Sequence, residues 1–555
     1  MSAVRQSAAK GTDVVDEGKP DSDEVRSEFT PPLGVDLPAE PEPEGSAFAP
    51  PSTTGTSPNT PPGAQAQAWF PAFTPPTGIP VVSLSKETPW PDRMRAMLRM
   101  SVTDRPAPEQ AAERSEAGPP VPRVLDLTLR IGELLLAGGE GAEDVEAAML
   151  GVAHAYGLAR VEPTVTFTLL GISYQPSLID PPVTANRTVR RRGTDYTRLA
   201  AVFRLVDDIT TSELTLEDAY RRLAEIRRNR HPYPGWLLTA SAGLLAGAAS
   251  MLVGGGGPLV FLIAAIGAML GDRLAWLCAG RGLPEFYQFT AAAMPAAVFG
   301  VLVDRFGHYL PGTSTIQASA VITGGLFALI PGRALVAAVQ DGLTGFYITA
   351  SARLLEVMYL FTGIVVGVTL VLYAGVSLGA VLDPQQSLST YENAPVQLVA
   401  AMALSLAFAV LLQCEREVLP LATLNGGVAW TVYGVLHQDV GMSPVAATAV
   451  AAGLVGLFGQ LLSRHRHASA LPYVTAAIGP LLPGSATYFG LLGLTQGHLS
   501  QGAASLTKAA ALALAVAIGV NLGGEIARMF LKVPGPVPAT SDPARRRAAK
   551  RTRGF

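Results

Sequence analysis

A few ionisable and amide side chains interrupt the long apolar runs of the C-terminal half, and they are the residues that could do chemistry there. Asn521, Glu525 and Arg528 recur at helical spacing and therefore share one helix face. Glu525 could carry a proton, or it could form an ion pair with Arg528. Asp272, beside Arg273 in an earlier apolar run, could line the inner mouth of a pathway or pair with charges on neighbouring helices. Because ionisable groups in such runs are costly, each is a candidate for proton transfer or ligand binding.

Four further polar residues could contact a ligand. Lys508, near the outer end of the last apolar run, could bind a carboxylate, pair with an acid or extend its ammonium group to the interface. Asn425 precedes two glycines, where a buried amide and a pliable backbone suit a polar site, although helix packing uses the same polarity. Ser485 and Thr487 follow a Pro-Gly pair, and their hydroxyl groups could line a pathway or cap a helix end.

Two apolar runs each contain a Pro-Gly pair, Pro331-Gly332 and Pro483-Gly484, at an offset of 152 residues. Proline removes a helix donor and glycine loosens the backbone. At membrane depth, the freed backbone groups are tolerated only beside protein or a water-filled cavity. An ordinary kink or helix end would explain either pair alone. Paired breaks in two halves of a chain indicate a binding site, so these four residues join the candidates.

The elements that must position these residues are apolar helices. Hydrophobic residues make up 49% of the 555 and charged residues 15%, against about 25% charge in soluble domains. The apolar excess is concentrated beyond residue 235, in runs near the length of about 20 residues that crosses a bilayer. Ten candidates lie at approximately 236–253, 258–278, 286–303, 314–332, 355–376, 396–413, 418–436, 444–463, 471–492 and 503–530. This pattern excludes a plain soluble enzyme and predicts a polytopic α-helical membrane protein.

The apolar half contains an internal repeat. The offset of 152 residues that relates the Pro-Gly pairs also relates Gly367-Val368-Thr369-Leu370 to Gly519-Val520-Asn521-Leu522. Five spans per repeat is an odd number, which predicts two inverted five-helix repeats at 236–382 and 383–531. Arginine and lysine favour cytoplasmic loops. Their distribution predicts a multi-pass protein of the cell membrane, with both termini cytoplasmic.

The remaining segments differ in composition. Residues 1–118 are rich in Pro, Ser, Thr, Gly and acids, which predicts a disordered extension. Within it, 93–100 could form a helix on an anionic membrane surface or one docked on the next domain. Residues 119–235 predict a small cytoplasmic α/β domain, with helices near 124–138, 143–156, 194–208 and 216–228 and strands at 161–174 and 184–192. A basic cytoplasmic tail follows at 532–555.

Several function classes are disfavoured by composition and motifs. The net charge of −3 gives no reason to expect a nucleic-acid partner. Two cysteines, Cys278 and Cys414, cannot provide a disulfide framework or a cysteine zinc site. The glycines around Gly138 lack a following Gly-Lys-Ser/Thr, and His154 has no Gly-x-Ser-x-Gly motif to serve. We therefore expect no enzyme activity, no metal and no cofactor.

Three sequence features together resemble the threonine/serine exporter family over about residues 121–531. They are the motifs of the N-terminal region, the ten spans in two halves, and the two Pro-Gly segments. The motifs are Gly132-Glu133-Leu134-Leu135-Leu136, Gly141-Ala142-Glu143-Asp144-Val145-Glu146, Ala155-Tyr156-Gly157, Pro331-Gly332-Arg333-Ala334-Leu335 and Pro480-Leu481-Leu482-Pro483-Gly484. Where the family often has serine at the turn after the first helix, this chain has Gly139 and Glu140.

The resemblance implies export of threonine and serine across the membrane, driven by the proton motive force. Related systems with the halves on separate chains imply an alternative, export of a dicarboxylate. A membrane-anchored sensor or scaffold is a third alternative, and a homo-oligomer stays open. The candidate pathway residues are Pro331, Gly332, Asn425, Pro483, Gly484, Ser485, Thr487, Lys508 and Asn521, and the candidate proton-coupling residues are Glu525 and Asp272.

Overall fold

The computed structural model describes most of the chain between residues 89 and 531. The described residues are 89–99, 102, 105, 120–177, 179–190, 193, 195–211, 214–228, 232–254, 257–306, 317–380, 394–466 and 468–531. The predicted basic tail and nearly all of the predicted disordered extension lie outside them. The described part of the extension contains helix α1 at Trp90–Leu98, where the sequence analysis had offered a helix at 93–100 within the segment expected to be disordered.

Helix α1 docks on the protein through its apolar face. Trp90, Met94 and Met97 are buried, and the helix packs against α3 and α4. The ring of Trp90 lies 4.7 Å from that of Phe203, centroid to centroid. Of the two arrangements open for this segment, the structure shows the docked helix, because its methionines are covered by protein.

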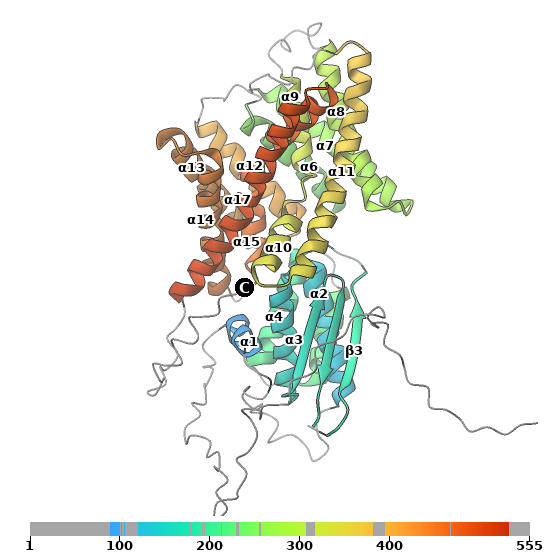
Figure 1. The fold of residues 1–555 in the computed structure, drawn as a ribbon, viewed down its shortest axis with the longest axis vertical. Coiled ribbons are helices and arrows are strands. Elements are labelled where there is room, and N and C mark those ends of the chain that lie inside the picture. The colour runs from blue at the N-terminus through green and yellow to red at the C-terminus, as the bar shows by residue number, and fades with distance from the viewer. Residues whose placement is uncertain are drawn as a thin grey trace, which may run out of the picture. The chain divides into compact units, whose positions relative to one another are not determined.

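Residues 121–228 form four helices and a small antiparallel sheet (Figure 1). The helices are α2 (Val121–Gly138), α3 (Ala142–Ala155), α4 (Tyr196–Thr211) and α5 (Leu216–Arg228), and the strands are β1 (Val161–Thr166), β2 (Leu169–Tyr174) and β3 (Val183–Thr188). The strand order is β1-β2-β3, and both pairs are antiparallel. Helix α2 packs against β2 and β3, and α3 packs against β1.

The single strand predicted at 161–174 is instead a hairpin. Thr166 pairs with Leu169, so the chain reverses at Phe167 and Thr168. Phe167 has a positive φ of 50°, which places it in the left-handed region that such turns require. The turn was not predicted because Phe167 and Thr168 continue the alternation of the strand sequence. Neither is a Gly, Asn or Asp, the residues that usually mark a turn. The next strand begins and ends earlier than the predicted 184–192.

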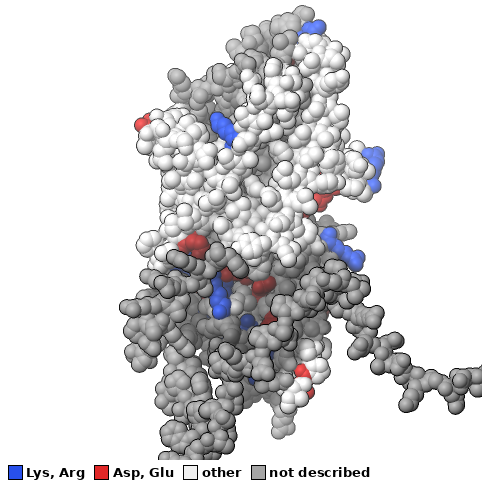
Figure 2. All heavy atoms as spheres, viewed as in Figure 1, with Lys and Arg blue, Asp and Glu red and all other residues white. Residues whose placement is uncertain are grey.

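Eight helices in the described part of the chain are long and apolar enough to cross a membrane. They are α6 (Gly235–Leu252), α7 (Pro258–Gly280), α8 (Glu285–Phe306), α11 (Tyr347–Ser377), α12 (Ala394–Leu411), α13 (Val418–Gly434), which continues as a π-helical turn at Val435–Asp439, α14 (Pro444–His465) and α17 (Leu499–Leu531). Figure 2 shows a face of these helices on which charged side chains are sparse. The prediction of a polytopic helical membrane protein is confirmed.

Two further candidate spans are broken at the predicted Pro-Gly pairs. Helices α9 (Ala318–Phe327) and α10 (Gly332–Leu343) are bent by 55°. Helices α15 (Leu471–Ala477) and α16 (Gly484–Thr495) are separated by a 3₁₀ turn at Gly479–Leu481, and this pair is bent by 40°. Counting each bent pair as one span gives up to ten spans. Proline causes both interruptions because it cannot donate the hydrogen bond that would continue the helix.

The helix pairs α8–α11 and α14–α17 pack closely at corresponding glycines. A Cβ on Gly367 of α11 would lie 2.3 Å from the carbonyl oxygen of Thr290 in α8. A Cβ on Gly519 of α17 would lie 2.3 Å from the carbonyl oxygen of Ala449 in α14. Only glycine permits these backbone approaches, so two residues related by the sequence offset have the same packing role.

Candidate functional site

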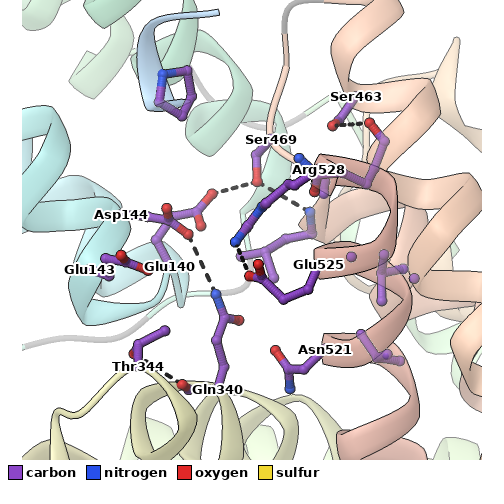
Figure 3. A pocket seen from close by; sticks show the side chains of 18 of the residues that line it. Glu140, Glu143, Asp144, Gln340, Thr344, Ser463, Ser469, Asn521, Glu525 and Arg528 are labelled. Atoms are coloured by element: carbon purple, nitrogen blue, oxygen red, sulfur yellow. Dashed lines mark hydrogen bonds and ion pairs between the residues drawn. The ribbon is translucent and has the colours of Figure 1, made fainter. Parts of the chain in front are cut away.

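A cavity of about 720 Å³ lies where α1 and α3 meet α10, α14, α15 and α17. We call it the interface cavity. Two of its walls come from the broken spans, because α10 is the second helix of one bent pair and α15 is the first helix of the other. Figure 3 shows acidic, amide and hydroxyl side chains from these elements around one space. Its polar lining residues include Arg95, Glu140, Glu143, Asp144, Glu146, Arg333, Gln340, Ser463, Arg464, Ser469, Asn521, Glu525 and Arg528.

Glu140, in the short connection between α2 and α3, joins the N-terminal elements to the second bent pair. Its side chain is hydrogen-bonded to the hydroxyl of Ser469, which precedes α15 and also accepts from the amide of Leu471 at 3.2 Å. The residue is 5% exposed. Burial, and next the Asp144 carboxylate, raise the pKa of Glu140 to about 7. The carboxyl group can therefore gain or lose a proton near neutral pH.

A buried ion pair holds the backbone of the same connection. The guanidinium of Arg353 on α11 lies 3.0 Å from the carboxylate of Asp341 on α10, and their side chains are 4% and 0% exposed. Arg353 also donates to the carbonyl oxygen of Glu140 at 2.9 Å, and Asp341 accepts from the amide of Ala142 at 2.8 Å. These bonds attach the connection to α10 and α11 of the first half.

Two glycines beside Glu140 allow this close contact. Gly139 has a positive φ of 96°, and a Cβ there would lie 2.9 Å from the guanidinium of Arg333. A Cβ on Gly141 would lie 2.9 Å from the side-chain amide of Gln340. Arg333 donates to the carbonyl oxygen of Gly138 at 3.1 Å. The glycine-rich turn thus fits along α10, from Arg333 near its first residue to Gln340 in its last turn.

Most other acids at the cavity are paired with arginine. Arg95 of α1 forms an ion pair with Asp144, and it lies 3.9 Å from Glu143. Asp144 also accepts from Gln340 at 3.5 Å. Glu146 differs, because it accepts from the amide of Val165 at 2.9 Å and is absent from the ion pairs of the described residues. Burial raises the pKa of Glu146 to about 7, against the lowering effect of that amide.

Of the predicted site residues, Asn521 and Glu525 line the interface cavity. Glu525 forms an ion pair with Arg528, which was the alternative to proton transfer, and its side chain is 59% exposed. The amide of Asn521 donates to the carbonyl oxygen of Ala517 at 2.8 Å. The shared helix face expected for these residues is present, and it forms one wall of the cavity.

The Pro-Gly residues lie at the two bends, where the broken spans contact each other. A Cβ on Gly332 would lie 2.8 Å from the side chain of Leu482, and one on Gly484 would lie 2.2 Å from the ring of Phe327. Helix α10 follows Pro331, and α16 follows Pro483. Thr487 is buried and donates to the carbonyl oxygen of Pro483 at 2.9 Å, while the nearby Ser485 is partly buried.

Like the Pro-Gly residues, Ser485 and Thr487, three further predicted residues lie outside the lining of the interface cavity. Asp272 on α7 accepts from the hydroxyl of Thr239 on α6 at 2.6 Å. Asn425 is 5% exposed, and its amide nitrogen lies within 3.4 Å of carbonyl oxygens on α14 and α15, whereas its oxygen has no partner among the described residues. Lys508 is exposed on α17. The structure thus does not bring these three residues to the cavity walls.

The sequence analysis missed Glu140, Asp341 and Arg353 as site residues. Two signals were present. Glu140 stands in a Gly-Gly-Glu-Gly turn, an unusual place for a carboxyl group that becomes buried. Asp341 and Arg353 flank the connection between two apolar runs, where charges of opposite sign can pair. Neither signal identifies the partner, because the contacts join segments distant in sequence.

Comparison with known proteins identifies the family of the chain. A family model of threonine/serine exporters matches residues 126–374, and a second, described as "Threonine/Serine exporter, ThrE", matches residues 397–525. A Mycobacterium tuberculosis protein named "Probable threonine/serine exporter" is 35% identical over 414 residues, covering 72% of this chain and 76% of that protein. The "Threonine/serine exporter" of Corynebacterium glutamicum is 30% identical over 423 residues, covering 74% and 84%. No solved structure matches the chain. The chain therefore belongs to the threonine/serine exporter family.

Proposed function

We propose that this protein exports L-threonine and L-serine across the cell membrane through the interface cavity. The observation that carries the proposal is the position of this cavity between halves of both broken spans. Substrate sites of secondary transporters commonly lie between repeats, at interrupted helices. Family membership supplies the substrate class, because the relatives are named for these two amino acids.

The lining of the cavity suits a small zwitterion. An amino acid needs an acidic or carbonyl partner for its ammonium group and a cationic or hydrogen-bond-donor partner for its carboxylate. The walls carry Glu140 and Glu146 as acids and Arg333 and Arg528 as cations. The volume of about 720 Å³ falls within the range of about 300–1,000 Å³ usual for ligand cavities. A dicarboxylate has no ammonium group to pair with these acids, which makes it the weaker candidate.

Two inverted five-helix repeats would supply the conformational change. The packing of α8 on α11 corresponds to that of α14 on α17, and Gly367 and Gly519 make the same kind of backbone contact. An odd number of spans per repeat gives opposite orientations in the membrane. Rocking of one repeat against the other would then expose the substrate alternately to the two sides.

We infer that proton antiport drives export and that both termini are cytoplasmic. In that orientation the interface cavity, next to the N-terminal elements, opens toward the cytoplasm and collects the substrate there. Glu525 and Asp272 remain proposed proton-coupling residues, because carboxylates in or near apolar helices can titrate during transport. The candidate pathway then runs from Asn521 toward the Pro-Gly bends.

The test is efflux from proteoliposomes that contain the full chain and are preloaded with labelled threonine. We expect efflux that increases with an imposed proton gradient and that unlabelled serine reduces by competition. Liposomes without protein, and the same liposomes with a proton ionophore, are the controls. Efflux of labelled succinate but not threonine would instead indicate a dicarboxylate exporter. If a folded, inserted protein moves neither compound, a sensor or scaffold becomes the better interpretation.

A further inference from the structure

The interface cavity contains one deeply buried carboxyl group that lacks a cationic side chain as partner. Asp144, Glu143 and Glu525 each pair with an arginine. Within the described part of the chain, Glu140 forms no ion pair, and its side-chain bond is to the neutral hydroxyl of Ser469. A buried carboxylate without a counter-charge is costly, so it either binds a proton or acquires a cation.

The charges around Glu140 have opposing effects on whether its carboxyl group is protonated or ionised. Arg95 of α1 and Arg353 of α11 favour the ionised form, and Asp144 of α3 opposes it. Arg353 forms its own ion pair with Asp341, and Arg95 forms one with Asp144. The other charged groups that line the cavity from the surrounding elements are Asp92, Arg99, Glu143, Glu146, Asp207, Arg333, Arg464, Glu525 and Arg528. Small changes in this environment can therefore move the proton.

We propose that the Glu140 carboxyl group is a shared binding site, occupied either by a proton or by the ammonium group of the transported amino acid. This inference rests on the proposed export of threonine and serine. When the carboxylate is ionised, the substrate ammonium supplies the missing counter-charge. When a proton from the water of the cavity binds, the group is neutral and the attraction is lost. Binding of substrate therefore releases a proton, as antiport requires.

The position of Glu140 links this exchange to both halves of the protein. Its backbone carbonyl is held by Arg353 of α11, and its side chain is held by Ser469 before α15. A change of occupant at the carboxyl group alters the bond to Ser469 while the backbone stays attached to the first half. The exchange of proton for ammonium would thus be transmitted to the second bent pair, which begins two residues after Ser469.

The experiment measures threonine binding to the purified full chain by calorimetry between pH 5.5 and 8.5. For one competing proton, the wild-type affinity at pH 6 should be about tenfold weaker than at pH 8, since each pH unit below the pKa costs a factor of ten. Titrations near pH 7 in buffers of different ionisation enthalpy should show proton release. Glu140→Gln should abolish both the proton release and the pH dependence, and bind at least tenfold more weakly at pH 8.

Three matched variants make the result specific. Glu146→Gln removes the other cavity carboxyl group whose pKa is raised to about 7. Ser469→Ala removes a hydrogen bond that favours the ionised form, so it should shift the midpoint of the pH profile upward. Ser469→Ala also tests the role of Glu140 if the Glu140→Gln variant does not fold. Glu417→Gln is the control, because Glu417 pairs with Arg466 on the surface, outside the cavity lining.

The outcomes separate this inference from the proposed function. Wild-type binding with normal pH dependence in Glu140→Gln, or a flat profile in Glu146→Gln alone, would overturn the assignment to Glu140 while leaving threonine export intact. An unchanged midpoint in Ser469→Ala would also contradict it. Binding of succinate without binding of threonine by the wild type would overturn both, because a dianion has no ammonium group to share the site.

Discussion

Arg353 on α11 lies 3.0 Å from Asp341 on α10, and both side chains are buried where the N-terminal elements meet the apolar helices. The pair does more than balance two charges. Through Arg353 it binds the carbonyl oxygen of Glu140, and through Asp341 it binds the amide of Ala142. One buried ion pair thus fixes the backbone on both sides of Gly141, next to Glu140 of the interface cavity.

Asp341→Asn should destabilise the protein strongly, because it leaves Arg353 charged and buried without its counter-ion. Loss of one partner of a buried pair costs about 3–5 kcal/mol. The measurement is thermal or denaturant unfolding of the purified protein in detergent. Glu417→Gln, which breaks the exposed pair with Arg466, is the control and should change stability by about 1 kcal/mol or less. Equal effects of the two substitutions would contradict the structural role of the buried pair.

Stability should decrease as the pH rises from about 4.5 to 7. The folded pKa values of Glu140 and Glu146 are raised to about 7, above the ordinary value of 4.5. The folded state therefore binds more protons than the unfolded state in this interval. The stabilisation is complete below pH 4.5, is lost through pH 7, and is constant above it. Unfolding of Glu146→Gln at pH 5 and pH 8 should show a smaller difference than the wild type. An identical difference would exclude Glu146 as a contributor.

Gly139→Ala should weaken the docking of the glycine-rich turn on α10. The substitution places a Cβ at a positive φ of 96° and displaces Arg333, whose bond to Gly138 is then lost. Gly345→Ala is a matched control, because Gly345 has a φ of 94° with nothing within 4 Å of its Cβ position. The control should report the backbone strain alone, about 1–3 kcal/mol. Gly139→Ala should lower the unfolding midpoint further and reduce efflux, which Gly345→Ala should not do.

Gly484→Ala should slow transport by disturbing the contact between the two bends. Its Cβ would lie 2.2 Å from the ring of Phe327 on α9, so the ring or the helix has to move. Gly434→Ala is the control at a helical position with open space, and alanine there should be neutral or stabilising by up to about 1 kcal/mol. Initial rates of threonine efflux are the readout. A normal rate in folded Gly484→Ala would remove the bend from the proposed mechanism.

Glu525→Gln should reduce proton-dependent efflux if Glu525 carries a proton. The alternative, a simple ion pair with Arg528, predicts efflux close to that of the wild type because the exposed side chain contributes little to stability. Efflux with and without a proton gradient distinguishes the two. Wild-type stimulation by the gradient would eliminate Glu525 and direct attention to Glu140.

The helices could be predicted from the sequence because their signals are local. Eight of the apolar runs appear as long helices, and the other two correspond to helix pairs that are bent at the Pro-Gly interruptions. The hairpin at Phe167 was missed, because a non-glycine residue adopts the turn conformation there. Helix α1 was expected from its spacing, but its position was left open, because the partners of its buried methionines are brought to it only in the folded protein.

The site could be predicted only in part, because its contacts are distant in sequence. Asn521 and Glu525 were found from their spacing on one helix face. The bond from Glu140 to Ser469 spans 329 positions, and that from Ala142 to Asp341 spans 199. Periodicity indicates which face of a helix is apolar, but it does not identify which distant residue will meet a turn. Lys508 is the opposite case, a residue that the sequence singled out and that does not line the cavity. An isolated charge in an apolar run can remain exposed.

The N-terminal elements also bind the connection between α12 and α13. The amides of Tyr196 and Thr197 donate to the carbonyl oxygens of Leu412 and Gln413 at 3.1 and 3.0 Å, and the hydroxyl of Tyr233 donates to the carbonyl oxygen of Cys414 at 2.7 Å. A polypeptide cut between α11 and α12 would therefore keep bonds across the nick. The segment ahead of the first span is therefore bonded to both halves, to α10 and α11 in one and to the connection between α12 and α13 in the other, and we expect the halves of such a cut chain to stay associated.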